Sequence, residues 1–122
     1  MKALLLIAHG SRRQRSNDEV IELAERLKSE CADHYDIVQA AFLELADTLI
    51  ADGIENCVND GATHITVLPY FLNSGRHVTE DIPHDIDVVR PKFPDVQIFI
   101  ADHIGASSAM IGMLKTAAIA KQ

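Results

Sequence analysis

Residues 2–8 read KALLLIA and run directly into His9-Gly10-Ser11, and this stretch decides the fold class. The run is aliphatic without polar alternation and is too short for a stable helix, which is typical of a strand buried on both faces. Such strands occur in parallel sheets whose faces are covered by helices. The opening of the sequence therefore predicts an α/β protein.

Four strand-like segments alternate with four helix-like segments along the chain. The predicted strands are 2–8, 36–43, 63–71 and 96–101. Apolar residues at helical spacing follow each strand, at 16–31, 50–58, 78–89 and 110–118. Asn17, Asp18 and Glu19 suit the positive end of the first helix, and Pro83 lies in the first turn of the third helix or kinks it. No linker or repeat divides the sequence, so 1–122 is predicted to be a single domain.

The order of these segments predicts the topology. Alternating strands and helices with right-handed crossovers give a three-layer α/β/α domain with a four-stranded parallel sheet and helices on both faces. In a flavodoxin-like sheet the strand order is 2-1-3-4, which places a topological switch between the first and third strands. Ligands of open α/β sheets bind outside the carboxyl ends of the strands at such a switch. We therefore expect the functional site between the loops that follow these two strands.

Composition and charge argue against several classes of protein. The 122 residues are 48% apolar, and 18 acidic against 11 basic residues give a formal charge of −7, which disfavours nonspecific binding to nucleic acid or anionic membranes. The opening apolar run is far shorter than the ~20 residues of a membrane span and lacks a signal-peptide cleavage pattern. Cys31 and Cys57 fit buried free thiols, so we expect a cytoplasmic protein.

Two histidines follow the two strands that flank the predicted switch. His9 follows the first strand and His77 follows the third, so we expect both rings to face one crevice. Neutral imidazole binds Co, Ni, Fe or Zn ions, and two imidazoles leave coordination positions open, which suits a metal in transit. The same nitrogens act as general bases near neutral pH. The alternative is that both rings make only local hydrogen bonds.

Residues beside these loops are candidates for substrate binding. Glu44 and Asp47 follow the second strand and either reach the crevice or begin the next helix, with Asp47 as its N-cap. Gly75 is interpreted as a position of special backbone conformation or close approach, and loop amides can bind carboxylates. Arginines flank both loops and either attract an anionic substrate or remain solvated. The candidates are Ser11, Arg12, Glu44, Asp47, Leu72, Asn73, Ser74, Gly75 and Arg76.

The other four histidines are weaker candidates. His34 and His64 are interpreted as structural or surface residues, the latter at the opposite edge of the sheet. His84 follows His77 by seven residues with Asp81 between them, and His103 ends the fourth strand, so an auxiliary role at the site is open for both. Sequence motifs of nucleotide binding, serine hydrolysis and thioredoxin-like chemistry are absent.

Three segments carry a resemblance to a known family: LLLIAHGSR at 4–12, AFLELAD at 41–47 and LPYFLNSGRHVTEDIP at 68–83. Together they resemble the small CbiX/SirB-type sirohydrochlorin chelatases, which are relatives of the class II ferrochelatases. A weaker match is ADHIGAS at 101–107. The resemblance implies a metal chelatase, a lyase that inserts Co²⁺, Fe²⁺ or Ni²⁺ into sirohydrochlorin or a similar tetrapyrrole without ATP, for cobalamin or siroheme biosynthesis. It also implies a homodimer, with the metal as substrate and no permanently bound cofactor.

The resemblance assigns roles to residues as well. His9 and His77 are implied to be the metal ligands, with His9 also the proton acceptor, while Glu44, Asp47 and 72–75 line the tetrapyrrole pocket. Metal insertion strips water from the cation and removes two pyrrole protons, so a site needs exchangeable ligands and a base instead of a closed cage. Two alternatives stay open: a noncatalytic carrier of tetrapyrrole or metal, and an interaction domain that keeps only the fold.

Overall fold

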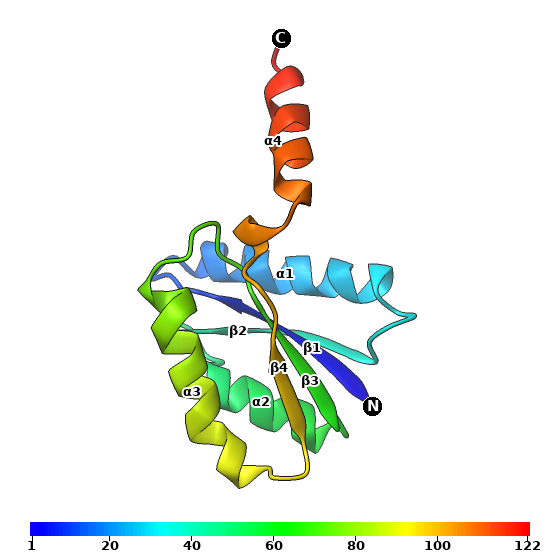
Figure 1. Ribbon diagram of the computed structural model, residues 1–122, viewed down its shortest axis with the longest axis vertical. Coiled ribbons are helices and arrows are strands. Elements are labelled where there is room, and N and C mark those ends of the chain that lie inside the picture. The colour runs from blue at the N-terminus through cyan, green and yellow to red at the C-terminus, as the bar shows by residue number, and fades with distance from the viewer.

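The computed structural model describes residues 1–122, in which four strands alternate with four α-helices (Figure 1). The strands are β1 (Lys2–Ala8), β2 (Ile37–Phe42), β3 (His64–Pro69) and β4 (Gln97–Ile100). The α-helices are α1 (Gln14–Glu30), α2 (Ile50–Asn59), α3 (Ile82–Val89) and α4 (Ala109–Ile119). Each strand lies within its predicted segment, with ends that differ by at most two residues.

The sheet has the predicted parallel topology, with the order β2-β1-β3-β4. Central β1 pairs with β2 on one side and with β3 on the other, so that Leu6 lies between Ala40 and Leu68. From β1 the chain passes to β2 on one side, and it then crosses back over β1 to form β3 on the other side. The topological switch therefore lies between β1 and β3, as predicted.

The core lies on both faces of β1, because its side chains alternate between them. Leu5 and Ile7 belong to a cluster of 15 buried residues under α2 and α3, whereas Leu4 and Leu6 belong to a smaller cluster of 4 under α1. Cys57 is a buried free thiol, as predicted. The same prediction is wrong for Cys31, which is only half-buried because it lies at the carboxyl cap of α1.

The segment before α3 begins as a wider helical turn. His77–Asp81 forms a π-type turn, η1, that leads directly into α3. Pro83, which has no N–H to donate, lies in the first turn of α3, directly after the wider turn of η1. Because the helical conformation starts at His77, this side chain is carried by a regular backbone instead of a loop.

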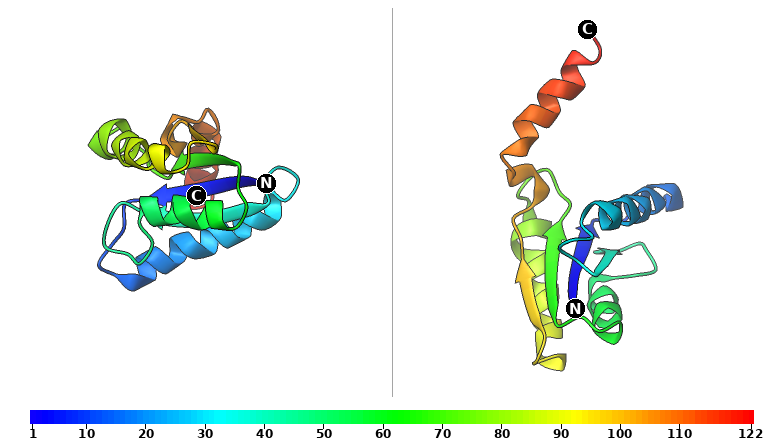
Figure 2. Two further views of the ribbon diagram at one scale, coloured as in Figure 1. Left: turned by 90° about the horizontal axis from the view of Figure 1, so that it is seen from below. Right: turned by 90° about the vertical axis from the view of Figure 1, so that its right-hand side faces the viewer.

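Helix α4 contradicts the prediction that the helices cover the sheet. None of its residues is buried, and it projects away from the rest of the chain (Figures 1 and 2). A short 3₁₀ turn, η3 (Ile104–Ala106), separates it from β4, and Gly105 lies so close to the backbone of Leu72 that no Cβ would fit. This contact directs the chain outward past the carboxyl end of β4. No helix in the chain has the length and apolar character that a membrane crossing requires.

Candidate functional site

The loops after β1 and β3 bring His9 and His77 together at the switch point. Their ring centroids are 4.5 Å apart, and the ring planes are inclined by 34°. The side chains remain 49% and 44% exposed, respectively. Two imidazoles that are distant in sequence therefore share one solvent-accessible position at the carboxyl edge of the sheet.

The backbone of His9 is held against the loop that follows β2. The amide of Glu44 donates to the carbonyl of His9 at 3.2 Å, which continues the pairing of β1 with β2 beyond the strands. Gly10 has a φ of +95°, and a Cβ at this position would collide with the carbonyl of Glu44. Glycine is therefore required here both by the conformation and by the close approach.

The side chain of Asn17, on α1, hydrogen-bonds to the backbone of both the loop after β1 and the loop after β2. It is 3% exposed and is the one buried polar residue of the chain. Its Oδ1 accepts from the Ser11 amide at 2.9 Å, and its Nδ2 donates to the carbonyls of Ser11 at 2.9 Å and Leu45 at 3.0 Å. Leu45 has a φ of +56°, which is strained for a residue with a side chain. Asn17 thus satisfies backbone groups of both loops and stabilises the strained one.

Sequence analysis missed this role because Asn17 fits the start of a helix equally well. The available signal is its spacing, since Asn17 lies three residues before Val20 and seven before Ala24 on the helix stripe that faces the sheet. A polar side chain on a buried stripe needs a hydrogen-bonding partner. Here the partner is the backbone of the candidate site.

Each histidine of the pair lies beside a carboxylate. The Nδ1 atom of His77 is 2.8 Å from Oδ2 of Asp81, one helical turn further on. A carboxylate that accepts from Nδ1–H leaves the lone pair of Nε2 free for a metal ion. In His9 the carboxylate of Glu44 approaches the other nitrogen, with Nε2 and Oε1 3.2 Å apart. A proton taken up by Nε2 of His9 can therefore be shared with Glu44.

The predicted substrate-binding residues divide into two groups. Glu44 lies at the histidine pair, but Asp47 lines a separate hollow beside α1, together with Gln14 and Thr48. The alternative prediction, that Asp47 is the N-cap of the second helix, is wrong, because the N-cap of α2 is Leu49. The two carboxylates that follow β2 thus face different surroundings.

The polar residues that flank the two histidines are less constrained. The hydroxyl of Ser11 accepts from the Arg13 amide at 3.1 Å, so it shapes the local turn. Arg12 is exposed, and the exposed Arg76 pairs with Glu80 at 3.3 Å. Both guanidinium groups are accessible to an anionic ligand.

The loop after β3 is open along its whole length. Leu72, Asn73, Ser74 and Gly75 are all exposed, and Leu72 also lines an apolar hollow of about 280 Å³ with Ile104. The prediction of a special conformation for Gly75 is wrong, because its φ is not positive and nothing lies within 4 Å of a Cβ built there. A close approach by a ligand remains as the predicted reason for this glycine.

The other histidines lie elsewhere. His84 lines a hollow with Leu43 and Val88, and Nδ1 of His64 lies 2.9 Å from the hydroxyl of Thr63. His103 precedes η3, and His34 is exposed after α1. No group of three or more His, Cys, Asp or Glu side chains is arranged to hold a metal ion. The candidate site is accordingly an open pair of imidazoles and not a closed cage.

The fold and the site together define a class of protein. The sheet is parallel, and two adjacent imidazoles lie at its switch point, each beside a carboxylate. These features indicate a small α/β protein suited to handling metal ions. Comparison with known families specifies this class further. Residues 3–120 match the family model described as CbiX, and the chain belongs to the CbiX family. The resemblance inferred from the sequence is confirmed.

Several characterised proteins are similar to the chain. Sirohydrochlorin ferrochelatase from Priestia megaterium is 32% identical over 114 residues, which are 93% of this chain and 42% of that protein. Sirohydrochlorin cobaltochelatase from Sulfolobus acidocaldarius is 32% identical over 94% of this chain and 88% of its own length. The solved structure of SirB from Bacillus subtilis with Fe³⁺ superimposes with a TM-score of 0.85 at 32% identity, over 94% of this chain and 45% of that one. The chain thus spans less than half the length of the ferrochelatases that it matches.

Proposed function

We propose that this protein inserts a divalent metal ion, Co²⁺ or alternatively Fe²⁺ or Ni²⁺, into sirohydrochlorin or a similar carboxylate-rich tetrapyrrole without ATP. The observation that carries the proposal is the His9 and His77 pair, with ring centroids 4.5 Å apart at an exposed switch point. The names of its relatives, sirohydrochlorin ferrochelatase and cobaltochelatase, support the reaction class. The metal ion is a substrate in this scheme, and no permanently bound cofactor takes part.

The two histidines would hold the metal ion only transiently. His77 presents Nε2, because Asp81 engages its Nδ1. Two neutral imidazoles leave most of the coordination sphere to water, and pyrrole nitrogens replace that water as the ion enters the ring. The absence of a third arranged ligand favours release over retention. The pair therefore suits delivery of an ion better than its storage.

Metal insertion also needs a base. The neutral macrocycle loses two pyrrole protons as it binds M²⁺, so the products are the metallated ring and two H⁺. His9 takes each proton in turn and passes it to solvent through Glu44, whose Oε1 lies 3.2 Å from Nε2. We assign this relay to Glu44 instead of Asp47, because Asp47 faces a different hollow.

The peripheral carboxylates of the macrocycle would bind the residues around the pair. Arg12 and Arg76 supply guanidinium groups, Ser11 supplies its hydroxyl, and the exposed 72–75 segment supplies backbone amides. Binding energy from these remote groups can be used to distort the ring toward its metallated geometry. One chain offers a single wall for such a ligand, so we propose that the working unit is a homodimer, with the two free thiols of each chain kept reduced in the cytoplasm.

The test is anaerobic absorbance spectroscopy of sirohydrochlorin with Co²⁺ and catalytic amounts of protein. Wild type should accelerate metallation over the protein-free control, and His9→Ala and His77→Ala should each reduce that acceleration by about 10²-fold or more. His84→Ala is the matched control and should retain the wild-type rate, because His84 lines a separate hollow. Stoichiometric binding without turnover would identify a carrier. No acceleration with Co²⁺, Fe²⁺ or Ni²⁺ would refute the enzymatic proposal.

A further inference from the structure

The carboxylate of Glu44 is an exposed group that nevertheless lies beside one particular nitrogen atom. Its side chain is 57% exposed, and its polar partner is Nε2 of His9, with Oε1 3.2 Å away. Exposed ion pairs of this kind are weak and do not by themselves hold a long side chain in one place. The backbone at Glu44 therefore decides whether its carboxylate lies within reach of His9.

That backbone is held on both sides of Glu44. Its amide donates to the carbonyl of His9 at 3.2 Å, and its carbonyl lies in the space that a side chain at Gly10 would occupy. The next residue, Leu45, has a φ of +56°, a conformation that residues with a Cβ rarely adopt and that persists only where surrounding contacts fix it. Because Leu45 is 48% exposed, packing of its side chain does not account for this conformation.

The contact that fixes Leu45 comes from Asn17. Nδ2 of Asn17 donates to the Leu45 carbonyl at 3.0 Å and to the Ser11 carbonyl at 2.9 Å, and Oδ1 accepts from the Ser11 amide at 2.9 Å. A side-chain amide offers two N–H donors and an oxygen acceptor, and here all of them are used. A carboxylate has no donor to offer, and a hydroxyl has only one. Among side chains of this length, the three bonds therefore require asparagine.

Apolar contacts already attach α1 to the sheet. Side chains on the same face of the helix, among them Val20, Ala24 and Leu27, pack against β1 and β2. Burying a polar side chain beside them costs free energy unless hydrogen bonds replace those that it makes with water. Asn17, at 3% exposure, regains these bonds from the two loops of the candidate site. Its buried position is therefore explained by the loops and not by the packing of the helix.

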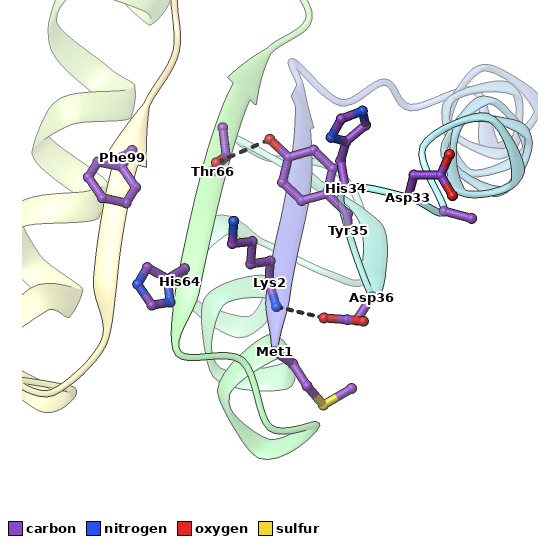
Figure 3. A pocket seen from close by; sticks show the side chains of 10 residues that line it. Met1, Lys2, Asp33, His34, Tyr35, Asp36, His64, Thr66 and Phe99 are labelled. Atoms are coloured by element: carbon purple, nitrogen blue, oxygen red, sulfur yellow. Dashed lines mark hydrogen bonds between the residues drawn. The ribbon is translucent and has the colours of Figure 1, made fainter.

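A second polar contact, beyond the other end of α1, is longer and partly open. Figure 3 shows Tyr35, which follows α1, directed toward Thr66 of β3. The Tyr35 hydroxyl donates to the Thr66 hydroxyl at 3.4 Å, and both residues border a hollow of about 550 Å³ at the amino edge of the sheet. None of the residues that line this hollow belongs to the candidate site. The short, buried bonds of Asn17 are thus specific to the carboxyl edge, where the two histidines lie.

We propose that Asn17 is a positioning residue for metal insertion, which holds the loop after β2 so that Glu44 stays beside His9 while the pyrrole protons leave. This inference rests on the proposed function and adds to it a residue that touches neither the metal nor the macrocycle. Each pyrrole N–H bond breaks as a new N–H bond forms at Nε2 of His9, and the proton then passes to Oε1 of Glu44 and to solvent, with no change of oxidation state. A shift of about 1 Å in Oε1 interrupts this path at its second step.

Loss of Asn17 should affect the rate through Glu44. Without the bond from Nδ2, Leu45 is free to relax to a negative φ, which rotates the peptide group that joins it to Glu44. The Glu44 carboxylate then moves away from His9, while His77 keeps its place on η1, which Asn17 does not contact. We therefore expect a loss in kcat that disappears once Glu44 itself is no longer able to accept the proton.

The test is a double-mutant cycle in the anaerobic assay with sirohydrochlorin and Co²⁺. Asn17→Ala and Glu44→Gln should each lower kcat by about 10-fold or more, and the double variant should be no slower than Glu44→Gln alone, because both changes interrupt the same step. Tyr35→Phe is the matched control: it removes the hydrogen bond beyond the other end of α1 and should keep the wild-type kcat. Asn17→Ser, which keeps one hydrogen-bonding group, should behave like Asn17→Ala and replaces it in the cycle if the alanine variant does not fold.

The outcomes separate positioning from a merely structural role. Losses that multiply in the double variant would overturn the proposal, because they would mean that Asn17 supports the fold and not Glu44, and a wild-type kcat in folded Asn17→Ala would overturn it as well. A second readout needs no substrate: at positive φ the amide and α hydrogens of Leu45 lie close together, so their nuclear Overhauser cross-peak should be strong in wild type and weak in Asn17→Ala. An unchanged cross-peak would contradict the proposal. A wild type that shows the strong cross-peak but does not metallate sirohydrochlorin would refute the proposed function and leave the hold of Asn17 on Leu45 standing.

Discussion

The two loops beside the histidine pair are built in opposite ways. The loop after β1 is locked, because Gly10 lies against Glu44 and the buried Asn17 bonds to the backbone on both sides. The loop after β3 is exposed from residue 72 to residue 76, and its glycine, Gly75, has open space around it.

This difference separates two tasks within one site. A base must stand at a fixed position relative to the proton that it removes, because misplacement by about 1 Å costs about 10²-fold in rate. A loop that admits a large macrocycle and releases it must instead adapt. In the proposed reaction, the β1 side holds the base His9. We infer that the segment after β3 yields around the substrate, while the helical turn η1 and the carboxylate of Asp81 orient His77.

The largest effect is expected for alanine at Gly10, and Gly75 is its control. Gly10→Ala should lower the free energy of unfolding by at least about 3 kcal/mol and abolish metallation, because it forces a side chain into a φ of +95° and into the Glu44 carbonyl. Gly75→Ala should change stability by less than about 0.5 kcal/mol and should weaken sirohydrochlorin binding if the ligand approaches this glycine closely. Urea unfolding and tetrapyrrole titration of both variants measure these effects. Equal losses of stability would contradict the distinction between a locked and an open loop.

The next effect is expected at Asn17. Asn17→Ala removes three hydrogen bonds in a buried position and leaves backbone groups of Ser11 and Leu45 unsatisfied, so the free energy of unfolding should fall by about 2–4 kcal/mol. The control Asn73→Ala, in the exposed loop after β3, should stay within about 0.5 kcal/mol of wild type. Thermal unfolding resolves the two. If Asn17→Ala were as stable as the control, the loop after β1 would be held by other contacts.

A smaller effect, on metal affinity alone, is expected at Asp81. Asp81→Ala removes the group that orients His77, and loss of such a partner typically weakens metal binding by 10–100-fold. Stability should hardly change, because the side chain is 42% exposed and exposed ion pairs contribute little. Glu80→Ala is the control, since its carboxylate pairs with Arg76 instead. Titration with Co²⁺, followed by visible absorption, should show weaker binding for the first variant and wild-type binding for the second.

The sequence predicts the sheet well because its information is local. The run at 2–8 can only be a doubly buried strand, and right-handed crossovers leave few topologies, so the adjacency of His9 and His77 follows from the strand order. The course of α4 cannot be predicted from local sequence, because it depends on the contact of Gly105 with Leu72, more than thirty residues earlier. The spacing of Asn17 indicates a buried polar side chain but not its partner, since Leu45 is distant in sequence. Apolar periodicity identifies a helix but does not identify the surface that covers it.

The last prediction concerns a single thiol, that of Cys57, which lies on α2 in the core. Burial, with a further contribution from the charge of Asp60, raises the pKa of Cys57 from 9.0 to about 11. The thiolate fraction near pH 8 is then about a hundredfold lower than for an ordinary thiol, so iodoacetamide should modify the half-buried Cys31 first and Cys57 only after unfolding. Because the folded thiol keeps its proton to higher pH than the unfolded one, the free energy of unfolding should decrease between pH 9 and pH 11 and be unaffected by this group below pH 9. Rapid labelling of Cys57 in the native protein, detected by mass spectrometry of its peptide, would show that the core under α2 opens far more readily than the packing of its neighbours indicates.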